Sequence, residues 1–282
     1  MGYKMLKEYE HFSKTADTAE TAMKRLYDIV SVLRKKCPWD MEQTHESLRG
    51  AMIEEIYEAV DAIDRGDLAN LREELGDITL HVVFHSNLAS ENGEFELKDV
   101  LNEECEKMIR RHPHVFSAEN KDKKAKTVDK VLEKWENIKS KEHSTETISA
   151  KLHDVPRALP SLMRSFKLQK RAAKVGFDWD DKTGALDKIL EEFDELKDAI
   201  SEGSAEHMEE ELGDLLFSVV NVSRFLSINP ELALKASADK FVKRFSKMEE
   251  IASNNHLKLE EMDVEQLELL WQKAKEDLSK QL

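Results

Sequence analysis

Two acidic segments recur with matched spacing in the two halves of this 282-residue chain. EEIYEA at 54–59 is followed by EELGD at 73–77, and EEFDEL at 191–196 is followed by EELGD at 210–214. Acidic residues three apart share one face of a helix, so two neighbouring antiparallel helices would bring four carboxylates together. The residues concerned are Glu55, Glu58, Glu74 and Asp77 in the first half, and Glu192, Glu195, Glu211 and Asp214 in the second.

The acids lie beside the apolar stripe of each helix, so they could be solvated or could line a second groove. Four carboxylates that share a partly dry groove predict a bound cation. Without one they repel each other, and their desolvation costs on the order of several kcal/mol each. All-oxygen ligands suit Mg²⁺, Mn²⁺ or Ca²⁺, and Mg²⁺ is favoured where phosphate oxygens complete its octahedral shell. Duplication for packing alone would explain repeated Leu and Ile, but it explains repeated charges poorly. We therefore expect Mg²⁺ binding in each half, with Mn²⁺ as a possible substitute.

Positively charged and aromatic residues also recur at matched distances after the acids. Each half has a K-x₃-R pair and, further on, a W-x₃-K pair. Lys and Arg facing a metal–carboxylate site would offset the charge of a polyphosphate, and a Trp offers a flat face for a nucleobase. A solvated Lys or Arg and a core Trp remain open alternatives for each residue taken singly. The set comprises Lys107, Arg111, Trp135, Lys139, Lys240, Arg244, Trp271 and Lys275.

Other kinds of site have weaker support. His81 and His85 follow Asp77 at helical spacing and could bind zinc, but Ser218 and Val222 stand at the matching positions. The sequence has no Walker A motif, no G-x-G-x-x-G and no G-x-S-x-G, so common phosphate loops and the nucleophile elbow are not indicated.

The composition predicts that helices position these residues. Glycine and proline are scarce, at 9 and 5 residues, and 36% of residues are charged. A sandwich or barrel needs many Gly- and Pro-rich turns, so an all-β fold is not expected. Loops are expected at 38–47 and 177–184. Helical periodicity predicts helices near 22–36, 48–63, 68–88, 97–111, 127–141, 159–175, 185–201, 205–227, 231–253 and 261–279.

The repeat predicts two tandem related domains in an all-α chain. We expect a polar N-terminal tail at 1–20, a helical domain at 21–143, a linker at 144–155 and a second helical domain at 156–282.

The charge balance and the apolar segments limit the partners. With 43 Lys and Arg against 58 Asp and Glu, the net charge is −15, which argues against direct nucleic-acid binding. The longest apolar stretches are too short to span a bilayer, and no signal peptide is visible at the start. Two cysteines form no disulfide framework. We therefore expect a cytoplasmic protein without membrane association.

The motifs resemble those of a known family, the MazG-type nucleoside triphosphate pyrophosphohydrolases of the all-α NTP-pyrophosphatase superfamily. Beside the acidic segments, the resemblance rests on CPWDMEQTHESL at 37–48, RRHPHVF at 110–116, VPRALPSLMRSFKLQKRAAKVGFDW at 155–179 and KFVKRF at 240–245. It implies Mg²⁺-dependent hydrolysis of nucleoside triphosphates to monophosphate and pyrophosphate, by helical bundles that form an intertwined homodimer. It also implies metal binding by the acids matching Glu192, Glu195, Glu211 and Asp214, and substrate contacts from Lys240, Arg244, Trp271 and Lys275.

We accordingly predict a nucleoside triphosphate pyrophosphohydrolase that acts in nucleotide housekeeping, in which Glu192 or Glu195 helps to deprotonate the attacking water. All matching residues are present in the first half, so metal-binding competence is expected there too. The competing hypothesis is a non-catalytic helical protein that dimerises and binds partners. Release of orthophosphate alone would indicate a third activity, that of a γ-phosphatase.

Overall fold

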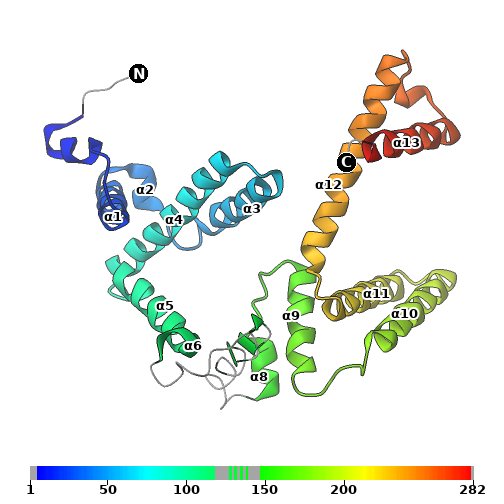
Figure 1. Ribbon diagram of the computed structural model, residues 1–282, viewed down its shortest axis with the longest axis horizontal. Coiled ribbons are helices and arrows are strands. Elements are labelled where there is room, and N and C mark those ends of the chain that lie inside the picture. The colour runs from blue at the N-terminus through cyan, green and yellow to red at the C-terminus, as the bar shows by residue number, and fades with distance from the viewer. Residues whose placement is uncertain are drawn as a thin grey trace. The chain divides into compact units, whose positions relative to one another are not determined.

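The computed structural model describes residues 5–117, 127–128, 130–131, 134–135, 138 and 147–280 (Figure 1). These residues are helical or in turns and contain no strand, which confirms the prediction of an all-helical chain. The chain divides into two units, Met1–Glu142 and His143–Leu282. Among the described helices, none combines the length and the apolar character that crossing a membrane requires.

The first unit carries its acidic residues on a hairpin of two long helices. Helices α3 and α4 pack extensively on each other, and α4 also packs on α1 and α5 (Figure 1). The elements are η1 (Lys7–Ser13), α1 (Ala19–Lys36), α2 (Pro38–Glu42), α3 (Arg49–Arg65), α4 (Leu68–Glu91), α5 (Leu97–Arg111) and α6 (Pro113–Phe116).

The second unit repeats this hairpin in α10 and α11. The two helices pack on each other, α11 packs on α9, and α12 packs on both α9 and α13. The elements are α8 (Ile148–His153), α9 (Ser161–Ala173), α10 (Lys182–Glu202), α11 (Ala205–Phe225), α12 (Pro230–Asn254), η3 (Leu259–Glu261) and α13 (Val264–Ser279).

Equivalent turns close the two hairpins, as the repeat predicts. Gly66 ends α3 with φ 68°, and Gly203 ends α10 with φ 75°, a left-handed conformation that suits glycine. The next residue caps the following helix in each case: the Asp67 carboxylate accepts from the amides of Ala69 and Asn70, and the Ser204 hydroxyl from that of His207. Such short turns place consecutive helices side by side.

Each unit also has a buried apolar cluster that joins some of its helices. The buried cluster of the first unit comprises Val30, Leu48, Val83, Phe84, Leu88 and Leu97. In the second unit, Met248, Ile251 and Ala274 join α12 to α13, with Trp271 packed against them.

Some predicted boundaries were wrong. The range 38–47, expected as a loop, contains α2, because Pro38 at the first helical position fixes φ and lacks only a hydrogen bond that a helix start leaves unmade. Helix α10 begins at Lys182 rather than near 185, because the Asp181 carboxylate accepts from the Thr183 amide at 2.7 Å. Helix α8 lies within 144–155, and the extent of the linker stays a prediction. The helix expected at 127–141 falls largely outside the described residues.

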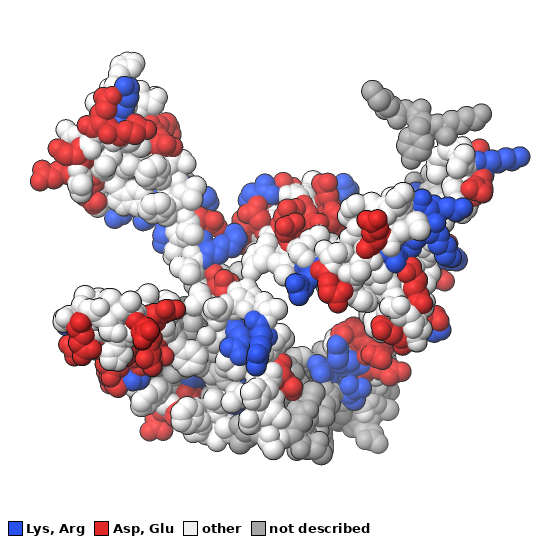
Figure 2. Space-filling model, turned by 180° about the vertical axis from the view of Figure 1, so that it is seen from behind, with Lys and Arg blue, Asp and Glu red and all other residues white. Residues whose placement is uncertain are grey.

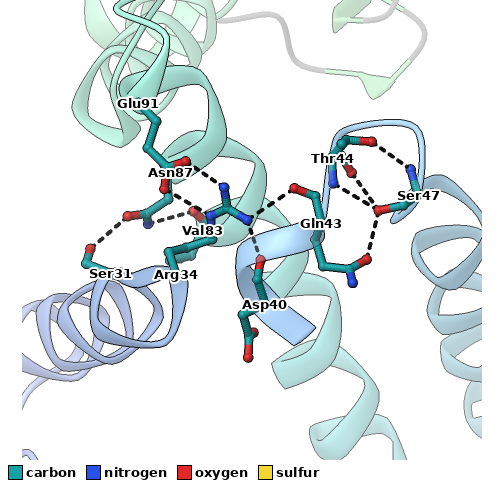
Figure 3. A network of polar contacts seen from close by, with 9 residues as sticks. All are labelled: Ser31, Arg34, Asp40, Gln43, Thr44, Ser47, Val83, Asn87 and Glu91. Carbon is teal, nitrogen blue, oxygen red and sulfur yellow. Dashed lines mark hydrogen bonds and ion pairs between the residues drawn. The ribbon is translucent and has the colours of Figure 1, made fainter. Parts of the chain in front are cut away.

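Arg34 fixes the segment between α1 and α3 to α4. Its guanidinium forms a two-pronged ion pair with Glu91, at 2.9 and 2.6 Å, and donates to the backbone oxygens of Asp40 and Gln43 (Figure 3). The hydrogen bond to Arg34 lowers the pKa of Glu91, although burial opposes the shift. One side chain thus holds the segment that carries Trp39 and Asp40.

Candidate metal centre and its adjoining pocket

Three glutamates converge in the second unit. One carboxylate oxygen from each of Glu192, Glu195 and Glu211 lies within 4.8 Å of the other two. Glu192 and Glu195 lie one turn apart on α10, and Glu211 lies on α11. Asp214, one turn after Glu211, lines a pocket together with Glu192. The α10–α11 hairpin therefore brings three of the four predicted acids together, and it places the fourth, Asp214, at the cavity that Glu192 also lines.

Glu192 is the most deeply buried member of this group, with 5% of its surface exposed. Its Oε1 forms an ion pair of 2.7 Å with Lys188, one turn earlier on α10. Its Oε2 is buried and has no hydrogen-bond partner among the described residues. A buried carboxylate oxygen without a partner is costly, and a cation would satisfy it.

The pKa values of two charged neighbours of Glu192 are also shifted. Hydrogen bonds to Glu191 and then Glu192 raise the pKa of Lys188 and keep it charged. Desolvation, followed by the effect of the adjacent Glu192 carboxylate, raises the pKa of Glu195. Glu195 is nevertheless exposed, so it can exchange a proton with solvent or substrate.

A cavity of about 590 Å³ adjoins the cluster. Lys188, Glu192 and Asp214 form one part of its lining, so the cavity opens directly beside the acids. The rest comes from α8, α9, α11 and the loop after α9, and is mainly apolar and aromatic. A pocket with an apolar body and a few polar groups at one end suits a small ligand.

An ion pair and a close packing contact fix the loop at this cavity. Arg224 on α11 forms two hydrogen bonds with the Asp178 carboxylate, one of them at 2.9 Å. The ring of Trp179 lies so close to Gly184 that a Cβ there would come within 2.8 Å of Trp179 Cε3. The loop 177–181 is therefore held from both α10 and α11.

The first unit has a similar acidic cluster with different neighbours. Oxygens of Glu55, Glu58 and Glu74 lie within 4.8 Å of one another. Burial, then the charges of Asp77, Glu58 and Glu74, raises the pKa of Glu55. Glu74 accepts a hydrogen bond from Asn70, whose side-chain oxygen accepts from Arg65 at 2.6 Å.

The residues predicted to bind the polyphosphate lie on other helices. In each half the Arg and the Trp of the repeated pairs are in contact. The guanidinium of Arg244 lies 6.0 Å from the Trp271 ring centre, and that of Arg111 lies 5.4 Å from the Trp135 ring centre. Lys107 pairs with Glu104.

These cationic residues are not gathered around the acids within one chain. Lys240 and Arg244 lie on α12, and Trp271 and Lys275 lie on α13. Helices α12 and α13 pack on each other and α12 also packs on α9, whereas neither packs extensively on α10 or α11. Lys139 lies outside the described residues.

The predicted zinc alternative at His81 and His85 gains a third histidine in the structure. Nδ1 of His45 lies 2.7 Å from Nδ1 of His85, with the two rings nearly parallel. Burial lowers the pKa of both His81 and His85. His81 and His85 lie on α4, and the His81 ring is tilted by 30° against that of His85, with the ring centres 6.2 Å apart. None of the three histidines belongs to the two glutamate clusters.

Sequence reasoning missed Lys188, Asp178 and Arg224. Lys188 precedes Glu192 by four residues, a helical spacing that would have identified it, but Ala51 stands at the matching position of the first half. A search for repeated residues excludes it for that reason. Asp178 and Arg224 are 46 residues apart and carry no local signal.

Known proteins share these segments. Residues 43–116 and 182–250 match the MazG nucleotide pyrophosphohydrolase domain, and these ranges include both glutamate clusters. The chain is 44% identical over 253 residues to the nucleoside triphosphate pyrophosphohydrolase/pyrophosphatase MazG of Thermotoga maritima, covering 88% of this chain and 94% of that protein. It is 41% identical over 261 residues to the nucleoside triphosphate pyrophosphohydrolase of Escherichia coli, covering 92% and 96%. The chain therefore belongs to the MazG nucleotide pyrophosphohydrolase family.

Proposed function

We propose that this protein hydrolyses nucleoside triphosphates to nucleoside monophosphate and pyrophosphate at the α10–α11 cluster. The observation that carries the proposal is the buried, unpartnered Oε2 of Glu192, which lies among three glutamates at the edge of a 590 Å³ cavity. The relatives in Thermotoga maritima and Escherichia coli bear names that state the same activity. We place the activity in the cytoplasm, as part of nucleotide housekeeping.

The donor set fits a hard divalent cation. We propose that Glu192, Glu195, Glu211 and Asp214 hold Mg²⁺, with Mn²⁺ as a substitute, and that Glu55, Glu58, Glu74 and Asp77 do so in the first unit. Carboxylate oxygens, one of them buried without a partner, are the ligands that such ions prefer. When bound, the ion offsets the charge of the phosphates and makes the attacking water easier to ionise.

The protein's own groups then carry the proton and the charge. Water attacks one phosphorus of the α–β anhydride, and the bond from that phosphorus to the bridging oxygen breaks. Glu195 accepts the proton of the water, a role to which its exposed position at the edge of the cluster is suited. Glu192 is an alternative base. Lys188 lies against Glu192 and at the cavity, so it can turn from the carboxylate to a phosphate oxygen.

We further propose that the working form is a homodimer. Large apolar side chains are exposed on α10 and α11, among them Leu190 at 64% and Phe193 at 50%. Figure 2 shows broad uncharged areas between the acidic patches of these two helices, at its lower left. A second copy would cover these faces.

A second copy would also supply cationic residues to the acids. Lys240, Arg244 and Lys275 lie on helices that do not pack extensively on the α10–α11 hairpin within one chain. Trp271, beneath Arg244, would orient that guanidinium. Lys107, Arg111, Trp135 and Lys139 would have the same roles in the first unit.

One assay tests the activity. The full chain is incubated with mixed nucleoside triphosphates and Mg²⁺, and pyrophosphate and orthophosphate are measured separately. We expect pyrophosphate in equal amount to monophosphate, and loss of both in Glu192→Gln. Orthophosphate alone would indicate a γ-phosphatase, and no product would favour the non-catalytic interaction protein.

Sedimentation equilibrium tests the dimer. We expect twice the chain mass for the wild type and a shift toward the monomer when Leu190 is replaced by Glu. Exposed Leu6, far from the hairpin in sequence and in the other unit, provides the control position. A monomeric wild type with full activity would contradict the shared site.

A further inference from the structure

We propose that the cavity beside the α10–α11 cluster holds the nucleobase of the substrate, and that the Gln169 side-chain oxygen accepts a hydrogen bond from an N–H group of that base. This inference rests on the proposed function and adds to it the means by which the base is recognised. It places the base beside the aromatic side chain of Trp179, whereas the sequence predicts Trp271 as the residue that the base stacks on.

Gln169 presents a fixed and unused acceptor. It lies on α9, lines the cavity and is 8% exposed. Its amide nitrogen donates to the backbone oxygen of Phe217 at 2.8 Å. A carbonyl oxygen can only accept, so the amide cannot be turned the other way round, and Oε1 is the atom left over. That oxygen is buried and has no partner among the described residues. A ligand donor entering the cavity would satisfy it.

A second polar group in the cavity is oriented just as firmly. The side-chain oxygen of Asn221 accepts from two nitrogens of Arg224, at 3.1 and 2.9 Å. Because that oxygen is engaged by Arg224, the amide nitrogen of Asn221 remains to donate. Arg224 is itself held by Asp178. The cavity therefore offers one held acceptor and one held donor, which are the two kinds of hydrogen-bonding group that the edge of a base presents in complementary form.

Aromatic side chains supply a surface for the flat faces of a base. Trp179 and Phe177 line the cavity from the loop after α9, and 81% of the Phe177 surface is exposed in the chain alone. The packing of Trp179 against Gly184 fixes its ring. Stacking on an aromatic ring accepts any base, whereas the Gln169 acceptor requires an N–H group.

The position of the cavity fits the reaction. Lys188, Glu192 and Asp214 belong to its lining, so a base seated near Gln169 leaves its phosphates at the acidic end. Trp271, by contrast, packs against Met248, Ile251 and Ala274 between α12 and α13, and its ring is in contact with Phe241. Those contacts are typical of a structural tryptophan.

Adenine analogues test the hydrogen bond directly. Adenine has its only N–H donor on that edge at N6: N6-methyl-ATP keeps one N–H, and N6,N6-dimethyl-ATP has none. We expect wild-type kcat/KM to be similar for ATP and N6-methyl-ATP and to fall about tenfold for N6,N6-dimethyl-ATP, since the buried acceptor is left unsatisfied. In Gln169→Leu, the ratio of kcat/KM for ATP to that for N6,N6-dimethyl-ATP should fall to near one.

The ratio separates recognition from folding. Any general damage by Gln169→Leu lowers kcat/KM for ATP and for N6,N6-dimethyl-ATP by the same factor and leaves their ratio at the wild-type value. A wild-type ratio in a folded variant therefore overturns the inference. If Gln169→Leu does not fold, equal wild-type kcat/KM for the mono- and dimethylated analogues overturns it instead. Tripolyphosphate, which has no base, should inhibit wild type and Gln169→Leu with the same Ki. An altered Ki would assign Gln169 to the phosphates and contradict the proposal.

The two aromatic positions form a matched pair of variants. Trp179→Leu should raise KM for ATP without changing the Ki of tripolyphosphate, whereas Trp271→Leu should affect both through Arg244. If instead Trp271→Leu raised KM for ATP alone and Trp179→Leu did not, the base would be assigned to Trp271. If the wild type released pyrophosphate from none of the nucleoside triphosphates, the proposed function itself would be refuted. This outcome is distinct from all of those above.

Discussion

Each half holds three glutamates at matching positions, but different neighbouring side chains pair with them in the two halves. In the second unit, Lys188 pairs with Glu192, and the cluster opens onto an aromatic cavity. In the first unit, Ala51 stands at the position matching Lys188, and Glu74 is instead held by Asn70 and, through it, Arg65. The cavity beside that cluster, about 460 Å³, is lined by polar residues and Tyr57.

This difference separates two properties that the sequence repeat joins. The acids needed to hold a metal are present twice. The lysine, the aromatic wall and the buried acceptor of the proposed substrate site occur together at the second cluster. Duplicated metal binding therefore does not require duplicated catalysis, and variants in the two halves should differ in effect although they change equivalent residues.

The largest expected difference lies between Glu192→Gln and Glu55→Gln. The first removes a charge from the buried centre of the proposed catalytic cluster and should lower kcat for pyrophosphate release by about 10³-fold. The second should change kcat by about twofold or less, as at a site away from the reaction. Circular dichroism confirms that both variants fold. Equal losses would show that the halves share the catalysis.

Lys188→Ala should have the next largest effect. Loss of a cation beside the phosphates should lower kcat/KM by about 10²-fold, because the developing charge is no longer offset. Ala51→Lys is the matched change in the first half and should leave pyrophosphate release unaltered. A gain of activity in Ala51→Lys, measured in a Glu192→Gln background, would show that the first half lacks only this lysine.

Glycine substitutions near the start of α10 and α3 compare the two loops. Gly184→Ala drives a Cβ into the Trp179 ring, so the ring must shift, and kcat/KM for ATP should fall several-fold. Gly50→Ala meets nothing within 4 Å and should stabilise α3 by about 0.5–1 kcal/mol without changing turnover. Steady-state kinetics and thermal unfolding check both. Unchanged kinetics in Gly184→Ala would mean that the Trp179 position does not matter.

The smallest effect concerns the ion pair that holds the 38–47 segment. Glu91→Gln should lower the free energy of unfolding at pH 7 by about 0.5–1 kcal/mol, a modest value because Glu91 is partly exposed. The folded-state pKa of Glu91 lies below its ordinary value, so its contribution is complete above the unfolded-state pKa and is lost as pH falls through the folded-state pKa. Denaturant unfolding should show a difference in the free energy of unfolding between wild type and variant at pH 7 and no difference at acidic pH. A difference that persists in acid would contradict the electrostatic account.

The helices and the convergence of the acids could be predicted because both depend on spacing along one helix or across one short turn. Gly66 and Gly203 give clear stop signals, and acids three apart must share a face. These local rules place Glu192 and Glu211 near each other without further information. The fold class follows from the same periodicity.

The rest of the site depends on contacts between distant segments. The amide of Gln169 is fixed by a backbone oxygen 48 residues away, and Arg224 reaches Asp178 across 46 residues. Nothing in the sequence near Gln169 distinguishes it from a solvated helix residue. The separation of α12 and α13 from the acidic hairpin could not be predicted either, because periodicity gives a helix its apolar face but not its neighbour.

The short turn at Gly203 also bears on how the protein folds. It joins the helices of Glu192 and Glu211, which are only 19 residues apart, so their contact closes a small loop at little entropic cost. Contacts of low sequence separation form early. Each hairpin can therefore assemble its acids soon after it leaves the ribosome, before the helices that carry the distant cationic residues exist. In the second hairpin, Lys188 is synthesised four residues before Glu192 and can relieve the repulsion during that interval.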